Sequence, residues 1–173
     1  MKILLVALDS KYIHTNLAVR YLKKFCSEFN IVIKEFTINQ RLEFILGEIL
    51  PEKADLVCFS CYIWNIDYVN NISYILKEGN SETKILYGGP EVSFEIKDTM
   101  TKNSFIDYII FGEGEVTFKE FLLEYTKSEP DFSKVKGLAY RQQGNININE
   151  NRELVDNLDI INYPYKLEEK FKD

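Results

Sequence analysis

Lys2-Ile3-Leu4-Leu5-Val6-Ala7-Leu8, the stretch that decides the fold, is an almost unbroken apolar run that passes straight into polar residues. A short, continuously apolar run is typical of a strand that is buried on both faces, as in a parallel sheet covered by helices. The run is too short for a membrane span or a signal peptide. We therefore expect a first strand here, inside an α/β sheet.

Further short apolar runs follow this strand and alternate with longer segments of helical spacing. This alternation predicts five βα units, because parallel strands need crossover helices to join them. The predicted fold class is α/β: a doubly wound, five-stranded parallel sheet of the flavodoxin-like or Rossmann-like kind. The expected strands cover residues 2–8, 31–38, 55–60, 84–87 and 108–111, and the expected helices cover residues 15–29, 41–50, 65–77 and the segment from the glycines at 112–114 to about 125.

The pattern changes after Pro130, where residues 137–141 and 146–148 alternate like the two arms of a β-hairpin. Gly144-Asn145 is the expected turn between these arms. The predicted organisation is an α/β domain at residues 1–130, a hairpin extension of the same domain at residues 131–153, and a linker at residues 154–173.

Length and composition fit one soluble domain, since a chain of 173 residues with 46% hydrophobic residues can bury a core without disulfides or metals. The formal net charge is −6 and no long basic run occurs, so nucleic acid is not an expected partner. Three cysteines, at positions 26, 58 and 61, are an odd number and indicate a reducing compartment. We expect a cytoplasmic protein without a membrane span.

Ligands of open parallel sheets bind beyond the carboxyl ends of the strands, where the strand order reverses. Four loops therefore matter most, at residues 9–15, 60–64, 88–93 and 112–117. In the third loop, Gly88-Gly89-Pro90-Glu91 contains two glycines that let backbone N–H groups face a ligand closely, and Pro90 suits a first helical turn. An ordinary tight turn between strand and helix explains the same residues.

The fourth loop, Gly112-Glu113-Gly114-Glu115-Val116-Thr117, imitates a dinucleotide-binding fingerprint. Thr117 stands where the third glycine belongs, and the motif follows the fifth strand and not the first, so a dinucleotide site is excluded. Glu113 and Glu115 would act as caps at the helix N-terminus and would repel a pyrophosphate. A neutral ligand rich in amides fits this loop better.

The second loop, Ser60-Cys61-Tyr62-Ile63-Trp64, combines a hydroxyl, a thiol and two large aromatic side chains that suit a flat macrocycle. Core packing of Tyr62 and Trp64 is the alternative. Cys58 and Cys61 form a C-x-x-C pair inside a strand run, without the further ligands of a metal site, and we interpret both as structural. His14, the only histidine, is either a metal ligand in the first loop or an ordinary hydrogen-bonding residue.

Four motifs in this order carry a family resemblance: the opening strand, His14-x-x-Leu17-Ala18, the Gly-Gly-Pro-Glu loop at 88–91, and residues 107–118 with Gly112-Glu113-Gly114-Glu115. The chain resembles the N-terminal cobalamin-binding domains of cobalamin-dependent radical SAM proteins, in particular those similar to anaerobic magnesium-protoporphyrin IX monomethyl ester cyclase. Residues 137–141 are similar to a hairpin that follows this domain in the family, and residues 158–165 are similar to the linker into the radical SAM barrel.

The resemblance implies that cobalamin is the cofactor and that it lies across the strand ends. The residues implied to contact it are Ser10, Tyr12, His14, Thr15, Ser60, Cys61, Tyr62, Trp64, Gly88, Gly89, Pro90, Glu91, Gly112, Glu113, Gly114 and Glu115. The family signature Asp-x-His-x-x-Gly is not matched, because Asp9 and His14 are five residues apart and Leu17 replaces the glycine. Radical SAM relatives without that signature hold cobalamin without a histidine ligand, so His14 is a weak candidate for the cobalt ligand.

The family's catalytic chemistry belongs to a downstream domain that carries a Cys-x-x-x-Cys-x-x-Cys motif, S-adenosylmethionine and a 4Fe-4S cluster. This chain has no such motif and hence no complete catalytic site. We expect the downstream radical SAM domain to belong to the same polypeptide and to perform methyl transfer or oxidative cyclisation.

Two other functions remain open on the sequence alone: a scaffold of the same fold without cofactor, and a flavodoxin-like flavin module. The flavin module requires a phosphate loop rich in Ser, Thr and Gly after the first strand, and residues 10–15 contain no glycine. A signalling receiver is excluded, because Ser60-Cys61 and Phe111-Gly112 occupy the places of its essential aspartate and lysine. The cobalamin hypothesis requires that the rim of the sheet is open and is not filled by its own side chains.

Overall fold

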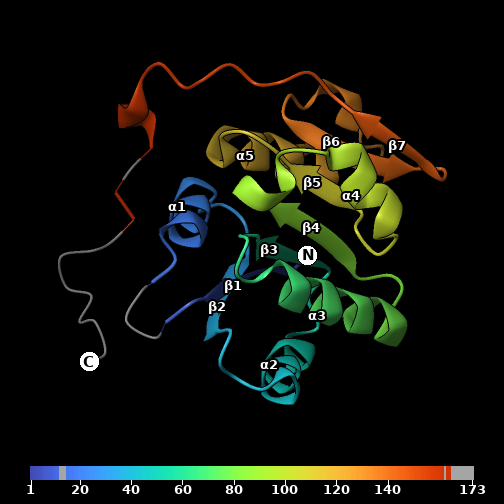
Figure 1. Cartoon of the computed structure of the whole chain (residues 1–173). Coiled ribbons are helices and arrows are strands. Elements are labelled where there is room, and N and C mark those ends of the chain that lie inside the picture. The colour runs from blue at the N-terminus through green and yellow to red at the C-terminus, as the bar shows by residue number, and fades with distance from the viewer. Residues whose placement is uncertain (12–14, 162, 165–173) are drawn as a thin grey trace.

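One mixed sheet organises the molecule, with helices on both of its faces (Figure 1). The structure is a computed structural model that describes residues 1–11, 15–161 and 163–164. The strand order is β2-β1-β3-β4-β5-β6-β7. The strands are β1 (Ile3–Asp9), β2 (Ile31–Thr37), β3 (Leu56–Ser60), β4 (Lys84–Gly88), β5 (Tyr108–Ile110), β6 (Leu138–Gln142) and β7 (Asn145–Ile148), and the α-helices are α1 (Leu17–Phe25), α2 (Leu42–Ile49), α3 (Ile66–Gly79), α4 (Ile96–Lys102) and α5 (Gly114–Tyr125).

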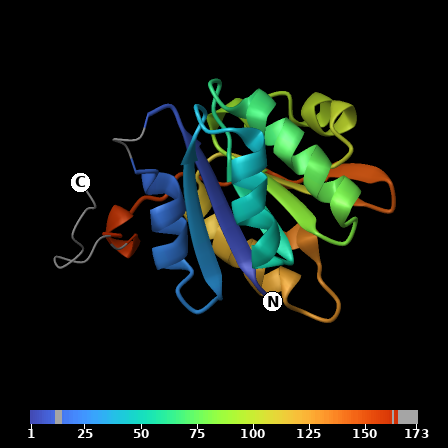
Figure 2. The same cartoon turned by 90° about the horizontal axis from the view of Figure 1, so that it is seen from below.

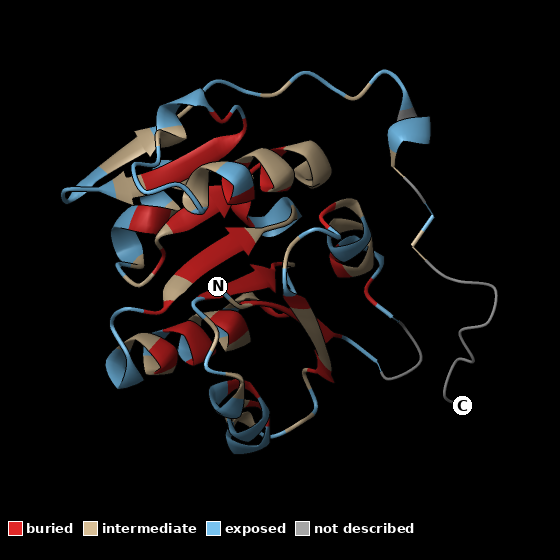
Figure 3. Cartoon of the chain, turned by 180° about the vertical axis from the view of Figure 1, so that it is seen from behind, coloured by how far each residue is buried: buried red, intermediate tan, exposed pale blue. Residues whose placement is uncertain are grey.

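The two faces of the sheet carry separate cores, which follow from the alternation of side chains along a strand. In β1, where every residue is buried, Leu4, Val6 and Leu8 pack with buried residues of α2, α3 and α4. Ile3 and Leu5 point the other way and pack with α1 and α5. Figures 1 and 2 show these two helical layers, and Figure 3 shows the buried strands between them. The predicted doubly wound α/β fold is therefore confirmed.

The strand order reverses between β1 and β3. The chain leaves β1 for β2 on one side and then crosses to β3 on the other, and both neighbours pair with β1 in parallel, with Ile3 opposite Ile31 and Leu56. The helices that follow β1 and β3 consequently leave toward opposite faces of the sheet, which opens a crevice at their carboxyl ends.

The predicted hairpin continues the sheet. Strand β6 pairs antiparallel with β5, so the five parallel strands are extended to seven strands in one sheet. The turn lies one residue earlier than predicted, because Gln143 and Gly144 take the two left-handed positions, with φ of 50° and 80°. Asn145 already belongs to β7. Asparagine, aspartate and glycine are the residues preferred at the first left-handed position, so glutamine gave no turn signal and the sequence pointed to Gly144-Asn145.

Two helices differ from expectation. Helix α1 is shorter than the predicted 15–29, because Asn16 accepts a hydrogen bond from the N–H of Val19 and so caps its start, while Cys26 lies at its C-cap. A helix was expected directly after the fourth strand, with Pro90 in its first turn and without stated bounds, but α4 begins only at Ile96. It has seven residues and buries Met100 alone, so it offers too few apolar positions to reveal a helical period. No helix among the described residues is long and apolar enough to cross a bilayer.

Candidate functional site

A cavity of about 340 Å³ lies at the carboxyl ends of the strands, between the sheet and the pair of helices α1 and α5. Its walls are mostly apolar, and its volume falls within the range of small-molecule sites. The lining residues are Leu5, Ala18, Val19, Leu22, Cys58, Phe59, Ser60, Tyr62, Leu86, Gly88, Gly89, Pro90, Ser93, Ile110, Gly112, Gly114, Glu115 and Phe118. The rim of the sheet is therefore hollowed, as the cobalamin hypothesis requires.

Asn16 fixes the helix wall of the cavity to the strands. Its side-chain amide donates to Asp9 Oδ1 at 3.3 Å and to Ser60 Oγ at 3.1 Å, and its backbone N–H donates to Glu35 Oε1 at 2.8 Å. All of these groups except Glu35 are buried, where unpaired polar atoms would be costly. The buried amide thus joins the start of α1 to the ends of β1 and β3, at the reversal of strand order.

The β3–α3 loop places an aromatic pair at the cavity mouth. Tyr62 lines the cavity, and the ring of Trp64 stacks on it with centroids 4.5 Å apart and planes 6° from parallel. Trp64 is 46% exposed, so the core-packing alternative does not describe this residue. The loop is held by Asn65, which accepts the N–H of Tyr62 and donates to the carbonyls of Leu8 and Ser60.

Cys61 does not face the cavity. Its side chain is fully buried in the opposite core with α2 and α3, and its thiol donates to the Phe59 carbonyl. The period-two alternation of β3 explains this placement, because Ser60 faces the cavity and its neighbour must point the other way. Burial raises the pKa of the Cys61 thiol, so the group stays neutral.

The β4 loop contributes backbone surface. Gly88, Gly89, Pro90 and Ser93 line the cavity, while Glu91 is exposed and does not. Gly89 has a φ of 111°, and a Cβ there would lie 2.5 Å from the Cys61 carbonyl oxygen. The glycine is therefore required for the close packing of the β3–α3 and β4 loops, a requirement that holds without any ligand.

The β5–α5 loop forms the remaining rim. Gly112 has a φ of 74°, and a Cβ at this position would have no atom within 4 Å. Its backbone therefore borders open space. Gly114, Glu115 and Phe118 line the cavity from the first turns of α5. Glu113 occupies the N-cap position, but its side chain does not cap the helix. Its Oε2 instead accepts the backbone N–H of Val155 at 2.7 Å, which corrects the predicted capping role.

The structure brings about half of the predicted site residues to the cavity wall. They are Ser60, Tyr62, Gly88, Gly89, Pro90, Gly112, Gly114 and Glu115. Ser10 and Thr15 are exposed and do not line it, and Tyr12 and His14 lie outside the described residues. The helix wall, formed by Ala18, Val19, Leu22 and Phe118, was missed, although the apolar faces of α1 and α5 beside the strand ends could have indicated it.

The three cysteines are free thiols, as the structural interpretation of the C-x-x-C pair requires. Cys58 lines the cavity, and burial raises the pKa of its thiol well above the ordinary value. Within the described ranges, no cluster of three or more His, Cys, Asp or Glu residues could hold a metal ion. The cavity therefore offers apolar surface, glycine backbone and a few hydroxyls.

Comparison with known families gives a match over most of the chain: the sequence model of the family described as "B12 binding domain" matches residues 3–122. The chain is 30% identical over 90 residues to the "Cobalamin-dependent radical SAM methyltransferase TokK" of Streptomyces tokunonensis. It is 29% identical over 99 residues to the "Anaerobic magnesium-protoporphyrin IX monomethyl ester cyclase" of Synechocystis sp.. The matches cover 52% and 57% of this chain but 13% and 20% of those proteins, so the chain corresponds to a small part of each relative.

Solved structures show the same fold. The chain superposes on the "Cobalamin-dependent S-adenosylmethionine radical enzyme OxsB with aqua-cobalamin bound" with a TM-score of 0.75 and 19% identity, over 94% of this chain and 24% of that one. A "cobalamin-binding protein from Desulfitobacterium hafniense" gives a TM-score of 0.55 and 14% identity, over 73% of this chain and 59% of that one. At these identities the likeness concerns the arrangement of the sheet and helices.

Proposed function

This chain belongs to the B12-binding domain family, and we propose that it holds cobalamin in and over the cavity between the sheet, α1 and α5. The observation that carries the proposal is the position of that cavity: it opens where the strand order reverses, beneath three loops with glycine or aromatic residues. Cobalamin has two parts of different chemistry, a broad corrin fringed with amides and an aromatic base on a nucleotide tail. The site also has two parts, an apolar cavity and a rim formed by loops.

The apolar cavity fits the aromatic base. The walls of the cavity are apolar and include Leu5, Val19, Leu22 and Phe118. Burial of a flat apolar group between them would be favourable by roughly 25 cal/mol of free energy per Å² of apolar surface removed from water. Ser60 lies at the same wall and offers a hydroxyl that can bond to a polar atom of the ligand. A cavity of about 340 Å³ cannot take the corrin as well, so the corrin would rest on the rim.

The rim fits the corrin. The Tyr62 and Trp64 pair presents a flat aromatic surface, and the Gly88, Gly89 and Gly112 backbone carries no side chain that would obstruct a broad ring. Backbone N–H and C=O groups in these loops can bond to the corrin amides. Bound cobalamin would supply a cobalt centre suited to methyl transfer or radical chemistry, and the protein's part is to hold and orient it.

The wider role is the second part of the proposal. One relative is named as a cobalamin-dependent radical SAM methyltransferase and another as an anaerobic cyclase. We therefore propose that the cobalamin faces a radical SAM domain of the same polypeptide, which performs methyl transfer or oxidative cyclisation. In this proposal residues 1–153 are the cofactor domain, and residues 154–173 are the linker to the radical SAM domain. The chain itself holds and presents the cofactor.

Titration with hydroxocobalamin tests the binding proposal. The visible spectrum of the corrin should change saturably on mixing, and the midpoint of thermal unfolding should rise with ligand concentration, as expected for any ligand that binds the native state alone. An A18W variant places a large side chain at the cavity wall from an exposed position on α1, so it should fold and lose binding.

A K24W variant is the matched control, because Lys24 is exposed on the same helix but does not line the cavity. Binding by K24W together with loss in A18W supports the proposed cavity. Absence of a spectral change with the unmodified chain would leave the cofactor-free scaffold as the better function. A flavin spectrum from the purified protein would instead favour the flavin module.

A further inference from the structure

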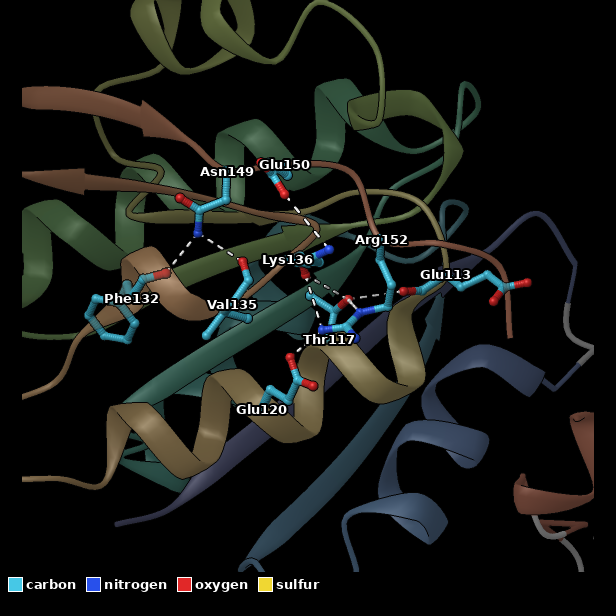
Figure 4. Close-up of polar contacts among 9 residues, drawn as sticks. All are labelled: Glu113, Thr117, Glu120, Phe132, Val135, Lys136, Asn149, Glu150 and Arg152. Atoms are coloured by element: carbon cyan, nitrogen blue, oxygen red, sulfur yellow. Dashed lines mark hydrogen bonds and ion pairs between the residues drawn. The ribbon is translucent and has the colours of Figure 1, made fainter. Parts of the chain in front are cut away.

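Residues 149–155, here called the C-terminal strap, are tied to the cofactor domain although they follow the last strand (Figure 4). Asn149 donates through its side-chain amide to the carbonyls of Phe132 and Val135, at 2.7 and 2.8 Å. The carbonyl of Glu150 accepts the N–H of Gly137 at 2.8 Å. The strap thus begins as a continuation of the hairpin's hydrogen bonding.

Arg152 fastens the strap to α5. Its Nε donates to Thr117 Oγ1 at 2.8 Å, and its Nη2 contacts the carboxylate of Glu120 one turn further along the helix. The arginine side chain is only 14% exposed, and Thr117 is fully buried. The bond to Thr117 is therefore shielded from water, whereas the Glu120 side chain is 42% exposed, so its ion pair with Arg152 contributes less.

Thr117 is the centre of the arrangement. Its hydroxyl lies 3.1 Å from the Lys136 carbonyl and 3.3 Å from the Glu113 carbonyl, the acceptors to which it can donate, while it accepts from Arg152. A single buried hydroxyl therefore joins the strap, the approach to β6 and the first turn of α5. Thr117 does not line the cavity, so its role is separate from direct ligand contact.

The far end of the strap reaches the cavity rim. The N–H of Val155 donates to Glu113, which lies between the two cavity-lining residues Gly112 and Gly114. Gly112 has no side chain that could anchor this loop. The carboxylate of Glu113 is thus bound by the strap and not by its own helix. Further along, Pro164 lies beside α1, in a groove that it lines with Arg20 and Lys24. The chain after the hairpin contacts both helices that wall the cavity.

We propose that the strap is a positioning element for the ligand site: Arg152 and Thr117, without touching the ligand, hold the Gly112–Gly114 loop in the conformation that binds it. The inference rests on the proposed cobalamin function. Coupling between two sites is reciprocal, so a ligand that binds against this loop must also stabilise the strap. The chain that follows Val155 would in this way sense whether the cofactor site is filled.

Substitution at position 117 tests the proposal. T117V keeps the volume of the side chain but removes the hydroxyl, and T117S keeps the hydroxyl. We expect T117V to weaken hydroxocobalamin binding about tenfold, the effect of one or two lost buried hydrogen bonds, and T117S to bind as the wild type does. Equal affinity of T117V and wild type overturns the inference.

R141A is the matched control for a general loss of stability. Arg141 is also partly buried and donates from its guanidinium to the carbonyls of Met100 and Ile106, on the other side of the sheet and away from the cavity. R141A should lower the urea midpoint yet keep the wild-type affinity for hydroxocobalamin. If R141A loses binding as T117V does, or T117S fails to restore it, the effect is one of stability and the inference is wrong.

Hydrogen exchange of the wild-type chain gives a measurement that needs no variant. Saturating hydroxocobalamin should slow exchange of the Val155 amide at least severalfold, and exchange should stay unchanged at exposed Ser81, in the turn between α3 and β4 and outside the strap. A wild-type chain that binds cobalamin without protection of Val155 overturns the strap inference alone. A chain that shows no cobalamin binding at all removes the proposed function and this inference with it.

Discussion

At the scale of single residues, Gly89 at the rim serves the packing of loops as much as any ligand. Gly89 was predicted to offer its backbone to a ligand, and its left-handed φ and its contact with Cys61 show that the glycine is also needed for packing. The sequence marks such a residue as special but cannot name its neighbour, because the contact joins segments 28 positions apart that meet only in the folded sheet.

Substitution of Gly89 by alanine should be costly. The backbone conformation alone disfavours any side chain by about 1–3 kcal/mol. The alanine Cβ would also collide with the carbonyl oxygen of Cys61, which is backbone and cannot move freely. We expect the free energy of unfolding of G89A, measured in urea, to fall by at least that amount. G47A is the control: Gly47 is in α2 with nothing within 4 Å, and alanine there should stabilise by about 0.5–1 kcal/mol. Unchanged stability of G89A would contradict the loop packing described here.

Stability should decline in alkaline solution, partly because of Cys26. Burial raises the pKa of its thiol from 9.0 to about 12, with a smaller contribution from Glu28. Between these values the unfolded state loses the thiol proton and the native state keeps it, so the native state binds more protons and unfolding becomes easier as pH rises. The contribution is fully present below pH 9 and is lost progressively toward pH 12.

Urea midpoints at pH 8 and pH 10 measure this effect. The wild type should lose about 1 kcal/mol more than C26A over this interval, because one pH unit above the unfolded pKa corresponds to about 1.4 kcal/mol. The tyrosines that ionise in the same range are common to both proteins and cancel in the difference. Parallel pH profiles of the two proteins would show that the Cys26 thiol is not shielded.

At the scale of elements, apolar residues in the sequence predicted the bounds of the strands well. The bounds of helix α1 depend on a capping contact that the sequence does not reveal. β1 to β5 lie within one or two residues of their predicted bounds, since each is rich in apolar residues, although β2 also contains Lys34 and Glu35. Helix α1 is shorter than predicted because Asn16 caps it while also bonding to Asp9 and Ser60, contacts between segments distant in sequence. The cavity wall on α1 was missed because helical spacing in the sequence does not show which part of the sheet the helix covers.

Asn65 should be among the costliest polar side chains to remove, since it ties β1, β3 and α3 together. Its amide satisfies the N–H of Tyr62 and the carbonyls of Leu8 and Ser60, and the residue is buried. N65A leaves these backbone groups without that partner, and we expect a loss of about 3 kcal/mol in the free energy of unfolding. N151A, at an exposed position of the strap, should change it by less than about 0.5 kcal/mol. Similar losses in both variants would show that the Asn65 bonds contribute little.

At the scale of the whole molecule, the fold places one site at the reversal of strand order and then ties the following chain back to it. The resemblance in the sequence indicated the family and the cofactor, and the family match agrees with both. The sequence did not reveal that the strap bonds to α5, because Arg152, Thr117 and Glu113 are ordinary polar residues until the hairpin brings them together.

The structure of the chain in complex with hydroxocobalamin tests the central claim most directly. We predict density for the aromatic base inside the cavity beside Val19 and Phe118, with the corrin lying over the Tyr62, Gly88 and Gly112 loops. Density at the opposite end of the sheet, for example in the hollow lined by Ile49 and Thr83, would contradict the account. So would a cavity that stays free of ligand at saturating hydroxocobalamin.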